Sequence, residues 1–173
     1  MMAPLAMVLG LFAPVCYAPP VSAVITVPYV QPACAYCSGH RGIQYAVATG
    51  TPVTAVSDGV VVFAGAVAGT RYVVVLHPDG MRATYGMLAS ASVRSGEVVH
   101  VGQVVGLSAV HLYFGLRDAA NAPVDPAPLL GRLVGRARLL PTDGSGGRPA
   151  AAPRLVCAGD VSRDADVAAI VRC

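Results

Sequence analysis

From Thr51 onward the chain consists of short, valine-rich segments separated by glycine turns, and this pattern limits the folds that it can adopt. Segments rich in β-branched residues and bounded by Gly, Pro or Asp are typical of β-strands. The strands predicted in this way cover residues 51–56, 60–65, 71–77, 81–85, pieces of 95–106, and 111–117. Because no long segment of helical periodicity lies between them, we predict an all-β fold, a sandwich or barrel-like sheet.

The predicted β domain spans roughly residues 36–140, preceded by an N-terminal arm at residues 24–35. A chain of 173 residues, 55% of them hydrophobic, is long enough for one domain with a substantial core. Residues 141–149 are rich in Gly, Pro and Ser and indicate a flexible linker to a C-terminal tail. Short helices are expected only at residues 126–134 and 162–171. The net charge of +3, without a run of Lys or Arg, gives no sign of nucleic-acid binding.

The first 23 residues carry no charge and contain an apolar run at residues 5–12. They end in Val21-Ser22-Ala23, a small-x-small cleavage pattern. We therefore expect a signal peptide cut after Ala23 and a protein secreted to the cell envelope, with membrane contact only through that peptide. A retained membrane anchor is the alternative, and the prolines that interrupt the apolar stretch argue against it.

Four cysteines would remain after this cleavage: Cys34, Cys37, Cys157 and Cys173. An even number in an exported chain indicates two disulfides, and the sequence does not choose among the three possible pairings. Redox chemistry or zinc binding at Cys34-x-x-Cys37 is the weaker alternative, because no βαβ pattern surrounds the pair.

Two short motifs have the form of two halves of a metal site: residues 40–44, His-Arg-Gly-Ile-Gln, and residues 111–113, His-Leu-Tyr. A catalytic zinc ion in a hydrolase has three protein ligands and leaves a fourth position for the attacking water. The patterns His-x-x-x-Asp and His-x-His would supply them. Here Gln44 stands at the acid position and Tyr113 at the second histidine position, so His40 alone is left as an ordinary ligand.

A series of short motifs follows in a fixed order: residues 39–44, 50–55, 58–61, 77–80, 84–85, 96, 102–103, 106, 111–114 and 124–126. In this order they resemble the lysostaphin or LytM-type zinc endopeptidases, from His40 to about Leu130. Residues 63–65, 115–117 and 139–141 are similar to a high-GC actinobacterial branch of that family. The resemblance implies the duplicated-hybrid-motif β fold, a zinc cofactor, and action on peptidoglycan peptides.

Residue by residue, the resemblance matches His40 to the first zinc ligand and His111 to a histidine that assists the water. Gln44 and Tyr113 replace the other two ligands, and Met87 replaces a second assisting histidine. A neutral amide is a weak zinc ligand, and a phenol with a pKa near 10 must ionise to bind well. Methionine cannot stabilise an oxyanion strongly. We therefore interpret His40 and His111 as vestigial and expect no zinc unless the site proves functional.

Tyr85, Met87 and Tyr113 flank the expected site and are candidates for a groove that holds glycan or peptide. His77 and His100 are expected at strand ends in contact with solvent.

The sequence thus predicts an exported, catalytically inactive domain that binds peptidoglycan or regulates a cell-wall hydrolase. The alternative is a zinc metalloendopeptidase that cleaves peptidoglycan cross-links. A third hypothesis is a secreted structural protein without a ligand.

Overall fold

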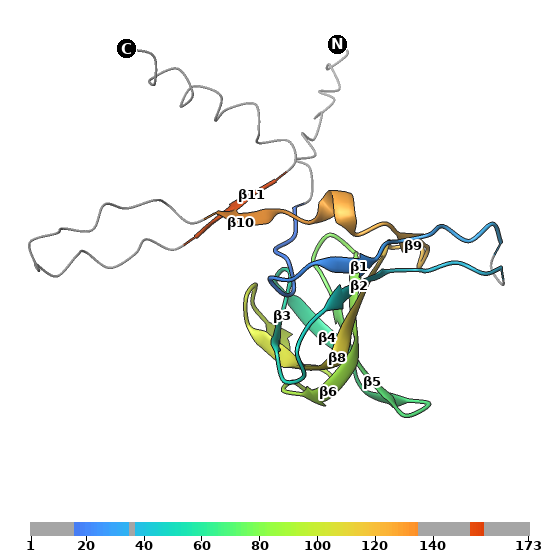
Figure 1. Cartoon of the computed structure of the whole chain (residues 1–173). Helices are drawn as coiled ribbons and strands as arrows, with labels where there is room; N and C mark the ends of the chain where they lie inside the picture. Colours follow the sequence, from blue (N-terminus) through green and yellow to red (C-terminus); the bar gives the residue numbers. More distant parts are fainter. Residues whose placement is uncertain (1–15, 35–36, 135–152, 158–173) are drawn as a thin grey trace, which may run out of the picture.

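The computed structural model describes residues 16–34, 37–134 and 153–157, and nine strands form one antiparallel sheet (Figure 1). The strand order is β1-β2-β8-β6-β5-β4-β7, with β3 and β9 both paired to β8. Their bounds are Ile25–Val27 (β1), Ile43–Ala46 (β2), Pro52–Thr54 (β3), Gly59–Val67 (β4), Thr70–Leu76 (β5), Arg82–Ala91 (β6), Val98–Val99 (β7), Val104–Arg117 (β8) and Pro123–Val124 (β9). The predicted all-β fold is confirmed.

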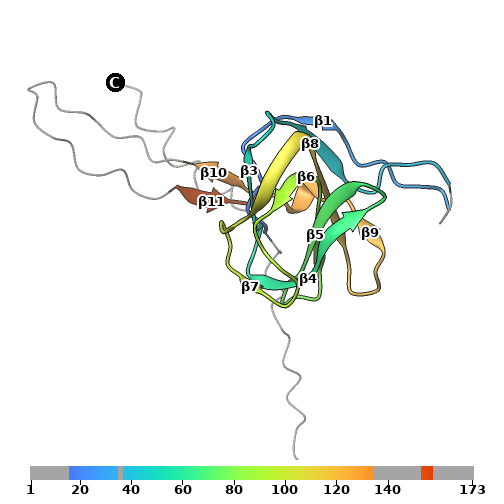
Figure 2. The same cartoon turned by 90° about the horizontal axis from the view of Figure 1, so that it is seen from below.

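Strand β8 is the longest and lies at the centre of the sheet, where it pairs with β2, β3, β6 and β9. Register shifts in its pairing with β3 and β6 mark bulges, and bulges bend a strand. The sheet accordingly curves around its own core (Figure 2). Alternation along β8 turns Leu112, Phe114 and Leu116 into this core and leaves His111 and Tyr113 on the other face.

The core is built from aliphatic and aromatic side chains of the paired strands. The largest fully buried ones are Tyr17, Ile43, Tyr85, Leu112, Phe114 and Leu116, together with a set of valines. Burial of such a side chain stabilises the fold by about 1.5–3 kcal/mol. Val61, Val73 and Val75 are buried in this core, whereas Val60 and Val62 of β4 are exposed.

The segment before β1 is part of this core. Tyr17 is 1% exposed, and its backbone N–H donates to the carbonyl oxygen of Leu129 at 2.9 Å. Its hydroxyl donates to Asp79 Oδ2 at 2.5 Å, and its ring centroid lies 5.4 Å from that of His77. Val21 is also buried. Cleavage after Ala23, which stays a prediction, would remove these contacts.

The segment after Asp125 differs from the expected helix at residues 126–134. One 3₁₀ turn, η1 (Ala127–Leu129), is followed by an extended Leu130 and by β10 (Arg132–Val134). Strand β10 pairs antiparallel with β11 (Arg154–Val156), so the chain beyond the expected linker returns to the domain. Residues 141–149 and 162–171 lie outside the described residues. Within the described ranges no helix has the length and hydropathy needed to cross a membrane.

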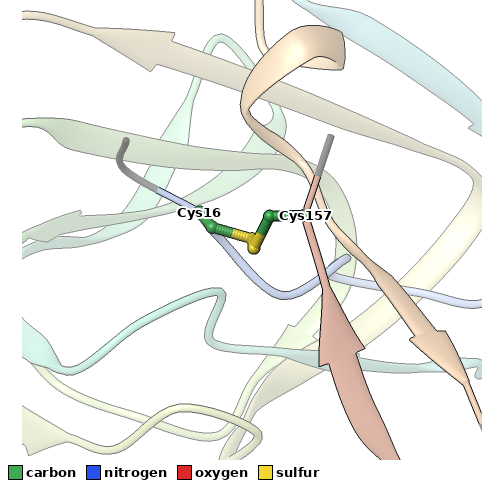
Figure 3. Close-up of a disulfide and its surroundings, with 2 residues drawn as sticks. All are labelled: Cys16 and Cys157. Carbon is green, nitrogen blue, oxygen red and sulfur yellow. A yellow bond between two sulfur atoms is a disulfide. The ribbon is translucent and has the colours of Figure 1, made fainter. Parts of the chain in front are cut away.

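Two disulfides join Cys16 to Cys157 and Cys34 to Cys37. The second is among the pairings that the sequence left open. The first corrects our expectation for Cys157, because its partner is a cysteine that we had assigned to the leader (Figure 3). Residues 16–21 pack beside β10 and β11, where a Cβ on Gly131 would lie 2.8 Å from Cys16 Sγ. Cys173 lies outside the described residues.

Candidate functional site

The two halves of the expected site meet on one face of the sheet because β2 and β8 are neighbours. Gln44 lies opposite Tyr113, and Ala46 lies opposite His111. Cross-strand partners in an antiparallel pair present their side chains on the same face. His40 precedes β2 and is held by a backbone bridge to Val30. The sequence was therefore correct that residues about seventy positions apart come together here.

The Tyr113 ring packs against the backbone at three glycines, Gly42, Gly86 and Gly115, which we call the glycine bed. A Cβ on Gly42 would lie 2.7 Å from Tyr113 Cζ, one on Gly86 3.1 Å from Cδ1, and one on Gly115 2.8 Å from the hydroxyl. The ring thus rests against bare backbone of three chain segments, and its hydroxyl donates to the carbonyl oxygen of Arg41 at 3.0 Å. The residue at the last ligand position is therefore packed onto the backbone beside His40. Local sequence patterns do not predict this packing, because Gly86 meets Tyr113 only through the pairing of β6 with β8.

The His40 ring packs edge-on against Tyr113, with centroids 5.7 Å apart and an interplanar angle of 85°. His40 Nδ1 lies 3.0 Å from the carbonyl oxygen of Pro28, which places a proton on Nδ1. His40 is thereby fixed between the arm before β2 and the Tyr113 ring.

Burial raises the pKa of the Tyr113 phenol, and this outweighs the opposing effect of Arg117 and Arg41. Tyr113 therefore stays protonated at neutral pH, with its proton directed to a carbonyl oxygen. The phenolate that could bind a metal is disfavoured in this position.

The zinc ion that the fold family implies does not fit this donor set. The three ligand positions hold an imidazole, a neutral amide and a protonated phenol, whereas catalytic zinc sites use His nitrogens and carboxylate or thiolate ligands. Among the described residues, no three His, Cys, Asp or Glu side chains are grouped so that they could hold a metal ion. We therefore derive no reaction step through zinc.

Met87 and His111 meet at a separate place on the same part of the sheet. They line a pocket of about 280 Å³ together with Thr70, Arg71 and Val110. Met87 sits at a bulge of β6 with φ of 60°, a left-handed conformation that is unfavourable for a residue with a side chain. The structure thus groups Met87 with His111 and, separately, His40 with Tyr113.

The prediction that Tyr85 lines a groove is wrong. It is 0% exposed, its hydroxyl accepts a hydrogen bond from the backbone N–H of Val56 at 2.9 Å, and burial raises its pKa. Tyr85 faces inward because Ala83 and Tyr85 share the core side of β6.

His77 also differs from expectation, since it is 3% exposed and its Nδ1 donates to the carbonyl oxygen of Asp58 at 2.7 Å. The side chain of His100 is 77% exposed, as expected.

The sequence pattern of Peptidase family M23 matches residues 38–126, just over half of the chain. An uncharacterised protein of Mycobacterium tuberculosis is 43% identical over 74 residues, which cover 42% of this chain and 29% of that protein. The DD-carboxypeptidase/endopeptidase Mpg of Neisseria gonorrhoeae is 37% identical over 94 residues, which cover 50% of this chain and 22% of that protein. The chain thus spans less than a third of the length of these relatives.

Solved structures share the fold. The catalytic domain of lysostaphin from Staphylococcus simulans is 26% identical, with a TM-score of 0.53 over 61% of this chain and 90% of that one. A chain of the pore-forming SpoIIQ–SpoIIIAH complex is 22% identical, with a TM-score of 0.60 over 68% of this chain and 92% of that one. The family pattern and these likenesses agree with the order of motifs in the sequence. The chain therefore belongs to peptidase family M23 and has the fold of its lysostaphin-type members.

Proposed function

We propose that this chain is a non-hydrolysing M23 domain of the cell envelope that binds peptidoglycan stem peptides. The observation that carries the proposal is the position of Tyr113, whose ring fills the glycine bed and whose hydroxyl bonds to the Arg41 carbonyl oxygen. A metal ion would have to displace this ring and would then meet Gln44 in place of a carboxylate. Retention of the fold without the ligand set supports binding rather than cleavage.

The pocket beside Met87 and His111 is the best candidate for the peptide. The described residues that line it include Arg71 and His111 but no carboxylate. Arg71 Nη1 donates to the carbonyl oxygen of Ala89, which holds the guanidinium at the rim. A fixed cation favours an anionic ligand, and stem peptides carry free carboxylates. Met87, an adaptable side chain, supplies an apolar wall.

The two disulfides support a location of the protein outside the cytoplasm. Cys16–Cys157 and Cys34–Cys37 require an environment that does not keep thiols reduced. Export, which the sequence predicted, is part of this proposal.

The test is co-sedimentation of the full, disulfide-intact chain with purified peptidoglycan. We expect binding without release of soluble fragments. Arg71→Gln should weaken binding about tenfold, because the loss of one charge-assisted hydrogen bond is worth about 1.5 kcal/mol. The matched variant Arg94→Gln, at an exposed arginine outside the pocket, should bind like the parent.

Two results would overturn the proposal. Absence of sedimentation at micromolar protein removes peptidoglycan as the ligand. Release of soluble fragments that a chelator stops would instead establish the alternative function, a zinc metalloendopeptidase acting on the cross-links.

A further inference from the structure

The chain between β1 and β2 forms an arm that projects from the sheet (Figure 1). The Cys34–Cys37 disulfide lies within this segment. Backbone hydrogen bonds in both directions between Val30 and His40, each 2.9 Å, close the arm at its base. Gly39 packs closely against Pro32, and the N–H of Cys37 donates to the carbonyl oxygen of Cys34 at 3.1 Å. The disulfide therefore lies beyond a base that has its own hydrogen bonds.

The two disulfides among the described residues differ in the distance along the sequence that each one spans. Cys16–Cys157 joins positions 141 apart and ties the N-terminal segment to the end of β11. Cys34–Cys37 joins positions only three apart. A cross-link restricts the unfolded chain more when it closes a longer loop, so Cys34–Cys37 contributes less to the stability of the fold. Its reduction would leave the core strands and the base of the arm in place.

Among the four disulfide-bonded cysteines, Cys34 is exposed, whereas Cys16, Cys37 and Cys157 are partly exposed. A thiolate from another molecule can therefore approach Cys34 directly. Exposed disulfides that contribute little to the stability of the fold exchange most readily with external thiols.

A pocket of about 270 Å³ lies beside Cys34. It is lined by Cys34 and Arg41 together with Gln31, Pro32, Ala33 and Pro123. Arg41 lines the same pocket, and a guanidinium near Cys34 Sγ would stabilise the negative charge of a thiolate by Coulomb attraction. The two prolines and the alanine give the pocket an apolar wall suited to a peptide segment. The pocket thus places a cation and an apolar wall beside the exposed cysteine of the pair.

We propose that Cys34–Cys37 is a thiol–disulfide exchange site that accepts a dithiol segment of a partner protein. A partner thiolate attacks Cys34 Sγ, the Cys34–Cys37 bond breaks, and Cys37 leaves as a thiolate that takes up a proton. The second partner thiolate then attacks the partner's sulfur in the mixed disulfide, and Cys34 leaves as a thiolate beside Arg41. Two electrons pass to the cysteine pair, and the partner dithiol is oxidised to a disulfide. This activity does not depend on the proposed binding of peptidoglycan.

The first experiment equilibrates the native full chain in a series of glutathione redox buffers, followed by acid quenching, alkylation and peptide mass analysis of each cysteine pair. We expect Cys34 and Cys37 to be reduced at ratios where Cys16–Cys157 remains oxidised. Arg41→Gln should shift the equilibrium of the Cys34–Cys37 pair about fivefold toward the disulfide. Arg94→Gln should leave it unchanged.

The second experiment identifies the attacked sulfur with a synthetic peptide that carries an activated disulfide. Cys37→Ser should trap the peptide on Cys34 several-fold faster than Cys34→Ser traps it on Cys37. Equal resistance of both native disulfides to reduction would overturn the proposal. Equal trapping at the two positions, or no effect of Arg41→Gln, would overturn the assigned roles of Cys34 and Arg41.

Discussion

The hydroxyl of Tyr113 donates a hydrogen bond to the carbonyl oxygen of Arg41 at 3.0 Å, across 72 positions of the sequence. This bond ties the middle of β8 to the residue after His40, the position that the family resemblance matches to the first zinc ligand. The glycines beneath the ring allow it to lie flat against the backbone. Tyr113 therefore both replaces a ligand and packs onto the backbone at this position, whereas Gln44 is a separate replacement.

The glycine bed predicts the effect of Gly86→Ala. The new Cβ would lie 2.6 Å from Tyr72 Cε1 and 3.1 Å from Tyr113 Cδ1, so both rings must move. We expect a loss of about 1–3 kcal/mol in the free energy of unfolding, measured by urea denaturation. The penalty should shrink in a Tyr72→Ala background, where the closer ring is absent. An equal penalty in both backgrounds would contradict this packing.

The sequence predicted strands β3 to β8, which follow from local patterns, but not β1, β2 or β9. The degenerate ligand set stays a prediction. Valine-rich segments between glycine turns define strands wherever a core is available. Gln44 and Tyr113 were identified by position within short motifs. What the sequence did not show is that Tyr113 folds down onto Gly86, since β6 contributes that glycine only through its pairing with β8.

The N-terminal segment is a second feature whose packing local sequence patterns do not predict. An uncharged, apolar stretch that ends in small residues is expected of a signal peptide, and the same composition also suits a buried segment. In the structure Tyr17 contacts the distant residues Asp79 and Leu129, which no local pattern reveals, and the signal peptide stays a prediction. Cys16 was excluded from the cysteine count for the same reason, and this left Cys157 without its partner.

The disulfides should differ in their effect on stability. Replacing Cys16 and Cys157 together by Ser should lower the free energy of unfolding by about 2–5 kcal/mol, because the bond closes the longer loop and holds the Tyr17 segment on the core. The double replacement of Cys34 and Cys37 should cost clearly less. Urea midpoints of the two variants compare them directly, and the reverse order would contradict the structural role given to each bond.

Stability should fall at alkaline pH because several tyrosines are buried. Burial raises the pKa of Tyr45 to about 12 and raises those of Tyr17 and Tyr85 further. In the unfolded chain these phenols lose their protons near pH 10, whereas in the folded chain they keep them. The folded state then binds more protons, so stability is constant below about pH 10 and decreases above it. Urea midpoints as a function of pH should show this decrease.

Tyr45→Phe provides the control for the alkaline effect. It should reduce the decrease between about pH 10 and 12, because one buried phenol no longer contributes to the linkage. A pH profile identical to that of the parent would exclude Tyr45 as a contributor.

The most direct test of a closed, metal-free site is the zinc content of the native chain beside that of the double variant Gln44→Asp, Tyr113→His. The variant restores a carboxylate and an imidazole at the two replaced positions and removes the hydroxyl that bonds to Arg41. A second variant, Gln44→Asp with Tyr113→Phe, controls for the added charge without the second imidazole. After dialysis against zinc and then against metal-free buffer, we predict one zinc ion per chain in the histidine variant and none in the parent or the control. One zinc ion per chain in the parent would contradict the claim that the site is closed and metal-free.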